Sequence, residues 1–331
     1  MSELKQALLQ SHLCKYLDLN DLDLLITYSR TVTFAAGKIL LEQGKQSTGT
    51  YMIIAGEALV TAKVLGAGSI NLLVLDQGNF IGEISLMLQT PSTVSVAAKT
   101  QLECLFISSA YFDMLTLFFP AAKFKISKAI TEDVCLRLKN ISKKITAFMA
   151  HAQMSSKSLF GEVFQSLNWP SETTLEAADI PHEVLQSDYF FNNLSKEQFE
   201  ILMKHATVLE AVNHCPLIKE GEKINVCYII LRGAVQSSLR QVNKHAKLSV
   251  LPPMNLFCSM AYVDGTPSLF EYFTCERSIL LKISESSLED LKNNHIEIWY
   301  FLYDRICQSF AALEQAASKL DIRLNSELYN R

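Results

Sequence analysis

The chain of 331 residues is 49% hydrophobic, has only 12 glycines and 8 prolines, and carries a formal net charge of −4. This composition excludes a disordered chain, leaves room for two domains with buried cores, and gives no general attraction to nucleic acid. No run reaches the roughly 18 to 20 apolar residues that span a bilayer, and Met1–Asn20 lacks the basic start and apolar core of a secretory signal. We therefore expect a cytoplasmic protein with no membrane span.

The first third of the chain has the pattern of an antiparallel β-roll with tight turns. A short helix is predicted around Leu17–Leu25, and glycines then separate short apolar runs. The predicted strands are Val32–Phe34, Lys38–Leu41, Tyr51–Ile54, Glu57–Val60, Ile70–Leu75 and Leu102–Ile107, with a hairpin at Gly66–Gly68.

One stretch of this roll, Phe80–Ala98, has features of an anion site. Gly82 lets backbone amides approach a ligand, and the short helix predicted after it points its N-terminus at the same place. Glu83 can accept a hydroxyl while the amides of Gly82, Ile84 and Ser85 hold a negative charge. The pattern suits a ligand that carries a phosphate and a sugar hydroxyl. A purely structural alternative is a glycine turn whose carboxylate caps nearby amides.

This stretch resembles the phosphate-binding cassette of the cyclic nucleotide-binding domain, the family of the bacterial catabolite-activator regulators and the regulatory subunits of cyclic AMP-dependent protein kinase. Gly82 and Glu83 match, and Ser92 stands where the family has its phosphate-binding arginine. Matches in type or position are Ile84, Ser85, Leu86, Pro91 and Ser95. The resemblance implies a cyclic nucleotide or related ligand in the first domain, with no other cofactor. The predicted ligand-binding residues are Gly82, Glu83, Ile84, Ser85, Ser92 and Thr93.

After Ser109 the hydrophobic period changes to that of a long helix, with an apolar stripe from Ile126 to Phe148. In the family, this helix covers the ligand and often pairs with a second chain, so the stripe predicts a homodimer. Packing against its own domain explains the stripe equally well. The segment Asn168–Pro181 is predicted to be a linker.

The second half of the chain repeats the first at a nearly fixed spacing, which predicts two tandem domains. The register pairs Gly44, Tyr51 and Gly56 with Gly221, Tyr228 and Gly233, and Thr90–Ser92 with Thr266–Ser268. We predict an α+β fold of two β-rolls of the double-stranded β-helix or jelly-roll kind, resembling cyclic nucleotide-binding domains, with flanking helices and a long C-terminal helix. The predicted domains are residues 1–155 and 156–331.

The second copy has lost the site residues. Ser259, Met260, Ala261 and Tyr262 stand opposite Gly82–Ser85, so both the glycine and the carboxylate are gone. We expect this domain to be structural or to bind a protein partner.

The sequence predicts no enzyme, because nucleophile-elbow, P-loop and zinc-protease motifs are absent. No metal site is predicted, because the first roll contains no histidine, and His214 and His245 in the second are far apart. The basic residues of the central helix, which include Arg137, are explained by a charged outer face. No DNA-binding domain is predicted. The expected function is a non-catalytic regulator that senses a ligand through its first domain, or else a pure interaction protein with two empty rolls.

Overall fold

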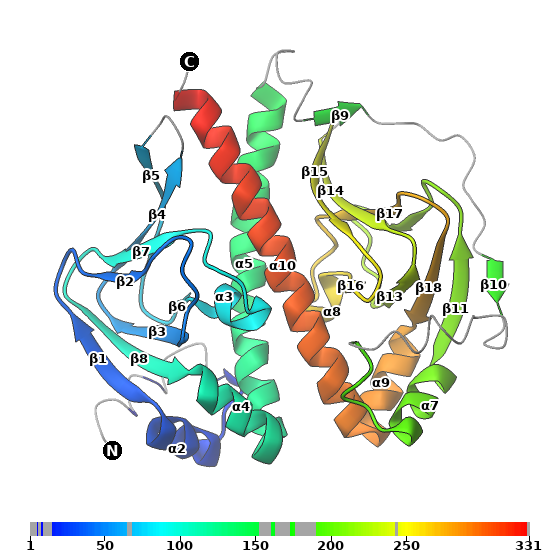
Figure 1. Cartoon of the computed structure of the whole chain (residues 1–331), viewed down its shortest axis with the longest axis horizontal. Helices are drawn as coiled ribbons and strands as arrows, with labels where there is room; N and C mark the ends of the chain where they lie inside the picture. Colours follow the sequence, from blue (N-terminus) through cyan, green and yellow to red (C-terminus); the bar gives the residue numbers. More distant parts are fainter. Residues whose placement is uncertain are drawn as a thin grey trace. The chain divides into compact units, whose positions relative to one another are not determined.

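A computed structural model describes residues 5, 8, 15–64, 68–151, 160–162, 173–175, 190–241 and 244–329. The chain divides into two compact units, one of Met1–Arg137 with Ser318–Arg331 and the other of Leu138–Ala317. Each contains a roll of antiparallel strands with helices beside it (Figure 1). The predicted α+β fold of tandem β-rolls with a long C-terminal helix is confirmed.

The first roll is built from two four-stranded antiparallel sheets, in the orders β1-β8-β3-β6 and β2-β7-β4-β5. Apolar side chains from both sheets meet in one core, among them Leu41, Ile53, Val60, Val96 and Cys104. The strands are β1 (Arg30–Phe34), β2 (Ile39–Leu41), β3 (Gly49–Ala55), β4 (Ala58–Val64), β5 (Gly68–Leu75), β6 (Phe80–Ile81), β7 (Ser95–Ala98) and β8 (Leu102–Ser108). The helices are α2 (Leu19–Tyr28), α3 (Glu83–Leu88), α4 (Ser109–Phe118) and α5 (Pro120–His151).

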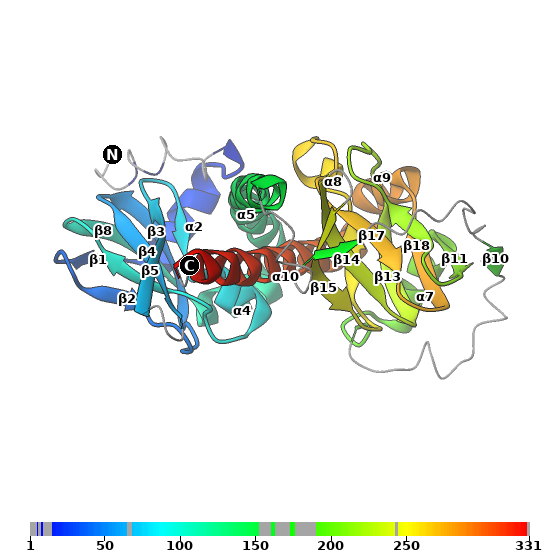
Figure 2. The same ribbon diagram turned by 90° about the horizontal axis from the view of Figure 1, so that it is seen from above.

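The second roll repeats this topology and adds one edge strand to each sheet, which gives the orders β10-β11-β18-β13-β16 and β12-β17-β14-β15-β9. Figure 2 shows this roll from above. Its strands are β9 (Phe160–Glu162), β10 (Thr173–Leu175), β11 (Ala206–Ala211), β12 (Pro216–Ile218), β13 (Cys227–Arg232), β14 (Val235–Gln241), β15 (Lys244–Leu251), β16 (Leu256–Cys258), β17 (Glu271–Thr274) and β18 (Ser278–Ile283). Its helices are α7 (Lys196–Lys204), α8 (Ala261–Asp264), α9 (Glu285–Asn294) and α10 (Ile296–Tyr329).

The segment predicted to be a linker contains a β-strand. The prediction for Asn168–Pro181 is wrong in part, because Thr173–Leu175 forms β10 and pairs with β11. The tip of the hairpin at Gly66–Gly68 and the rest of that linker lie outside the described residues. The domain boundary placed at residues 155 and 156 also lies outside them and stays a prediction.

The same backbone hydrogen bonds close equivalent turns in the two rolls. Gly78 N–H donates to the Ile53 carbonyl at 2.9 Å, and Met254 N–H donates to the Ile230 carbonyl at 2.7 Å. Asn79 and Asn255 accept from Ile53 N–H and Ile230 N–H, each at 3.0 Å. The repeat read from the sequence is therefore also a repeat of backbone structure.

The apolar stripe of the central helix is buried within the single chain. Ile126, Val134, Leu138 and Ile145 are each at most 1% exposed. The apolar residues of α10 are also buried, including Ile306, Leu313, Leu320 and Leu324. This burial agrees with packing inside the chain, and the homodimer stays a prediction. Among the described residues, no helix combines the length and apolar character needed to cross a bilayer.

Candidate ligand site in the first roll

The backbone between β6 and α3 requires glycine at position 82. Gly82 has a φ of 88°, in the left-handed region that favours glycine. A Cβ atom there would lie 3.1 Å from Ser47 Oγ and 3.2 Å from the Gly49 carbonyl oxygen. The turn brings the start of α3 close to the segment before β3, and it places Glu83 at the first position of the helix.

Glu83 is buried and forms an ion pair with a residue of the long helix that follows the roll. Its side chain is 3% exposed, and Oε1 accepts a short hydrogen bond from the Arg137 guanidinium, whose side chain is 13% exposed. The second carboxylate oxygen, Oε2, is buried and has no hydrogen-bond partner in the part of the chain that is described. Burial raises the pKa of Glu83, the positive charge of Arg137 opposes that rise, and the nearby Asp133 adds to it.

Arg137 is shared by two carboxylates. Asp133, one turn earlier on α5, has Oδ2 3.6 Å from Arg137 Nη1, and its side chain is 9% exposed. Asn79 Nδ2 lies 3.4 Å from the other oxygen of Asp133. Glu83, Asp133 and Arg137, called here the buried charge cluster, therefore combine two acids with one base.

The two predicted serine ligands donate their hydroxyl protons to backbone carbonyls. Ser85 Oγ donates a short hydrogen bond to the Thr90 carbonyl and accepts from Ser47 N–H at 3.2 Å. Ser92 Oγ donates to the Val94 carbonyl at 2.9 Å, and Ser92 N–H donates to the Lys45 carbonyl at 2.8 Å. Both serines are buried, whereas Ile84 and Thr93 are half-buried. The serines thus already hold the loop between α3 and β7 in place.

A family model for the cyclic nucleotide-binding domain matches residues 31–117 and 210–295, together more than half of the chain. The chain belongs to this family. The two matched segments fall one in each roll, in agreement with the tandem repeat.

The chain is similar in structure to several solved members of the family. The regulatory domain of Toxoplasma gondii PKA with cAMP is 13% identical over 90% of this chain and 93% of that chain, with a TM-score of 0.32. The regulatory subunit of a cAMP-independent protein kinase A from Trypanosoma cruzi bound to guanosine is 15% identical over 90% of this chain and 87% of that one, with a TM-score of 0.31. The Thermus thermophilus catabolite activator protein is 22% identical over 42% of this chain and 64% of that chain, with a TM-score of 0.36.

The equivalent position of the second cyclic nucleotide-binding domain holds no charged side chain. Tyr51 pairs with Ile81 and Tyr228 pairs with Phe257, which places the buried Ser259 at the position of Glu83, one residue away from the alignment read from the sequence. Met260 follows it as the N-cap of α8 and is 1% exposed. The Tyr262 ring packs edge-on against Trp299 with 5.7 Å between centroids, and burial raises the pKa of Tyr262. Here the structure places apolar packing where the first domain has its buried charge cluster.

Ser268 repeats the hydrogen bonds of Ser92 in a domain that has lost the site residues. Its Oγ donates to the Phe270 carbonyl at 2.8 Å, and its N–H donates to the Glu222 carbonyl at 2.8 Å. Gly44 N–H and Gly221 N–H donate to the Ser92 and Ser268 carbonyls at 2.8 and 2.7 Å. The Thr-Pro-Ser loop therefore has a scaffolding role that needs no ligand.

Arg137 is the site residue that sequence reasoning assigned to a different role. The basic residues of the central helix suggested a charged outer face, yet Arg137 turns inward to Glu83. Lys125 is also paired, with Asp18 at 2.8 Å, and Lys128 lies over the Tyr16 ring at 4.5 Å. One sequence feature pointed to an inward side chain: Arg137 lies between Val134 and Leu138, two residues of the apolar stripe that are buried in the structure.

Proposed function

We propose that the protein is a non-catalytic regulator whose first domain senses a nucleoside or nucleotide through Glu83. The supporting observation is the buried Oε2 atom of Glu83, which has no hydrogen-bond partner among the described residues. Buried polar atoms in proteins are nearly always hydrogen-bonded, because leaving one unsatisfied costs about 1 to 3 kcal/mol. A ribose hydroxyl of a bound ligand would supply that missing donor.

The charges around Glu83 favour an uncharged nucleoside over a cyclic phosphate. One guanidinium serves two carboxylates, and Ser92 stands at the position of the family's phosphate-binding arginine. An added anion would meet excess negative charge in a site with little solvent screening. We therefore expect adenosine or guanosine to bind more tightly than cyclic AMP or cyclic GMP.

The test is calorimetric titration of the full chain with these four ligands. Restoring the family residue by Ser92→Arg should strengthen cyclic nucleotide binding at least tenfold, because a charge-assisted bond to phosphate contributes about 1.5 to 3 kcal/mol. Ser268→Arg is the matched control, since it removes the same two hydroxyl contacts in the second domain. An equal gain in both variants would contradict the assignment. Glu83→Ala should weaken whichever ligand binds the wild-type chain.

A second candidate function is an interaction protein whose rolls hold no ligand. It is supported by the serine hydroxyls of the first domain, which already donate to carbonyls, and by Met260 and Tyr262 in the second. In this case the outer surface of the second domain would carry the protein partner. If none of the four ligands binds to the wild-type chain or to Ser92→Arg, this second function is favoured over ligand sensing.

A further inference from the structure

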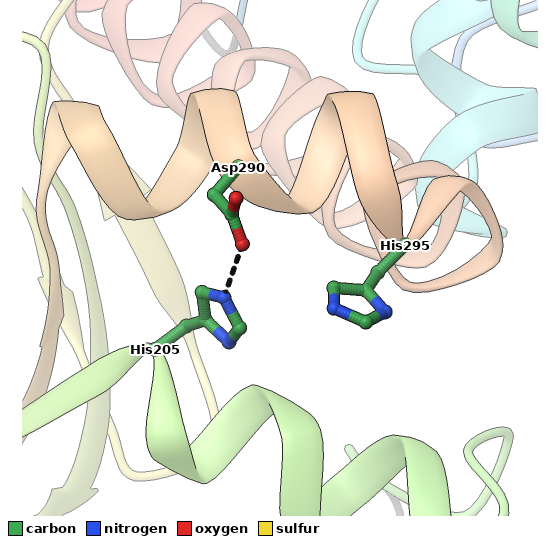
Figure 3. Close-up of side chains that lie close together, drawn as sticks. All are labelled: His205, Asp290 and His295. Carbon is green, nitrogen blue, oxygen red and sulfur yellow. Dashed lines mark hydrogen bonds and ion pairs between the residues drawn. The ribbon is translucent and has the colours of Figure 1, made fainter.

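Three side chains of types that can bind a metal ion lie close together near the C-terminal ends of α7 and α9 in the second unit. His205 directly follows α7, Asp290 lies on α9, and His295 directly follows α9. One donor atom from each lies within 4.8 Å of the other two. Figure 3 shows the His205 ring pointing from the end of α7 to Asp290, with the His295 ring beside this pair.

Hydrogen bonds from neighbouring groups fix two of these side chains. His205 Nδ1 lies 2.8 Å from the Ile201 carbonyl oxygen, which can only accept, so Nδ1 carries a proton and Nε2 is left toward Asp290. Asn294 Nδ2 donates to Asp290 Oδ1 at 2.7 Å, which leaves Oδ2 toward His205. Such outer contacts are the ones that orient imidazole and carboxylate ligands in metal sites.

His205 and Asp290 direct donor atoms at each other. Nε2 of His205 lies 2.6 Å from Asp290 Oδ2, so an imidazole nitrogen and a carboxylate oxygen converge beside the His295 ring. The side chains are 20% and 46% exposed, so solvent can reach the remaining coordination positions of an ion.

We propose that His205, Asp290 and His295 bind a divalent transition-metal ion of the zinc type. Two imidazoles and one carboxylate with an open fourth position are a donor set suited to Zn²⁺. Bonds of about 2.0 to 2.2 Å place neighbouring donors of a tetrahedron roughly 3.3 to 3.5 Å apart. The His295 ring must therefore move inward, and the His205–Asp290 contact must widen. The bound ion would join the end of α7 to the end of α9.

The test is titration of the chelator-treated full chain with Zn²⁺, followed by calorimetry, and with Co²⁺, followed by visible absorption. We expect one ion per chain, and His295→Ala and Asp290→Asn should each weaken binding at least tenfold. His245→Ala is the matched control. His245 lies 3.2 Å from Glu271 in the same unit and forms a histidine–carboxylate pair that should leave zinc binding unchanged when removed.

A thermal denaturation series keeps the proposal testable if a variant is partly unfolded. Zinc should raise the melting temperature of the wild-type chain and of His245→Ala in a concentration-dependent way, because it binds only the folded state at this site. The rise should be lost in whichever of His295→Ala and Asp290→Asn retains the circular dichroism of the wild type. Absence of saturable zinc binding, or equal binding by all the variants, would overturn the proposal.

Discussion

The two domains share the backbone and serine hydrogen bonds that hold their loops, but they differ in the side chains buried next to the short helices α3 and α8. Ser92 and Ser268 make matching bonds to the carbonyls two residues ahead, and the turns before β6 and β16 are closed in the same way. Where the first domain buries Glu83, the second buries the uncharged Ser259, and Met260 beside it is buried as well. The hydrogen bonds that hold the loops therefore form whether or not a charged residue is buried beside the short helix.

This difference indicates that the fold does not need the buried charge cluster. Burying charges costs several kcal/mol per ion, and replacing a buried ion pair by apolar residues is often neutral or stabilising. The second domain shows that the same frame folds with uncharged residues, Ser259 and Met260, in this place. The first domain nonetheless holds two acids and a base there, which favours a role in ligand binding for the cluster over a purely structural one.

The largest expected effect comes from removing the one base of the cluster. Arg137→Met leaves Glu83 and Asp133 buried without their counter-charge, and breaking a buried pair in this way costs about 3 to 5 kcal/mol. The midpoint of urea unfolding should fall accordingly. The double variant Glu83→Met with Arg137→Met removes one buried acid together with the base and should recover part of the loss.

The control for this experiment is an exposed pair in the second domain. Arg277 is 77% exposed and contacts Glu210, so Arg277→Met should not measurably change the unfolding midpoint. If Arg137→Met also leaves the unfolding midpoint unchanged, or if the double variant is less stable than Arg137→Met alone, the inference that Arg137 compensates buried acids is wrong.

The next effect concerns Gly82, whose position in the second domain is occupied by Cys258. Gly82→Ala places a side chain at a φ of 88° and brings Cβ within 3.1 Å of Ser47 Oγ, so both strain and crowding oppose it. Gly78→Ala is the matched control, because Gly78 has a φ of 89° and a Cβ added there would meet no atom within 4 Å. In urea unfolding, we expect the free energy of unfolding to fall by about 1 to 2 kcal/mol in Gly78→Ala and by roughly 1 kcal/mol more in Gly82→Ala. Equal losses would show that close approach to Ser47 contributes nothing.

Local sequence patterns predicted the frame, and long-range contacts set the chemistry. Gly82 and Glu83 were predictable because a turn and a helix start are fixed by adjacent residues. The partner of Glu83 was not, since Arg137 lies 54 residues away on a helix whose hydrophobic period says little about residues at the edge of the stripe. His205 and Asp290 are 85 residues apart and belong to no local motif, so only the folded chain brings them together.

The smallest effect is a pH dependence of stability caused by Glu83, which the second domain lacks because Ser259 stands at that position. Burial raises the pKa of Glu83 above its ordinary value of 4.5. Between that value and the raised one, the folded chain holds a proton that the unfolded chain has released, so this group makes stability fall as pH rises. Glu83→Gln keeps the shape of the side chain and should remove that fall.

The measurement is the difference in urea midpoint between the wild type and Glu83→Gln, followed upward from pH 4.5. Taking the difference between the two proteins cancels the contribution of the other titrating groups. The sign of the remaining slope against pH then shows whether desolvation or the charge of Arg137 has the larger effect on the pKa of Glu83. If desolvation dominates, the wild type loses stability relative to the variant as pH rises, by at most about 1.4 kcal/mol per pH unit. A relative gain instead would mean that Arg137 lowers the pKa of Glu83. The carboxylate would then be held ionised by Arg137 at Oε1, which leaves Oε2 to accept a hydrogen bond from a ligand hydroxyl.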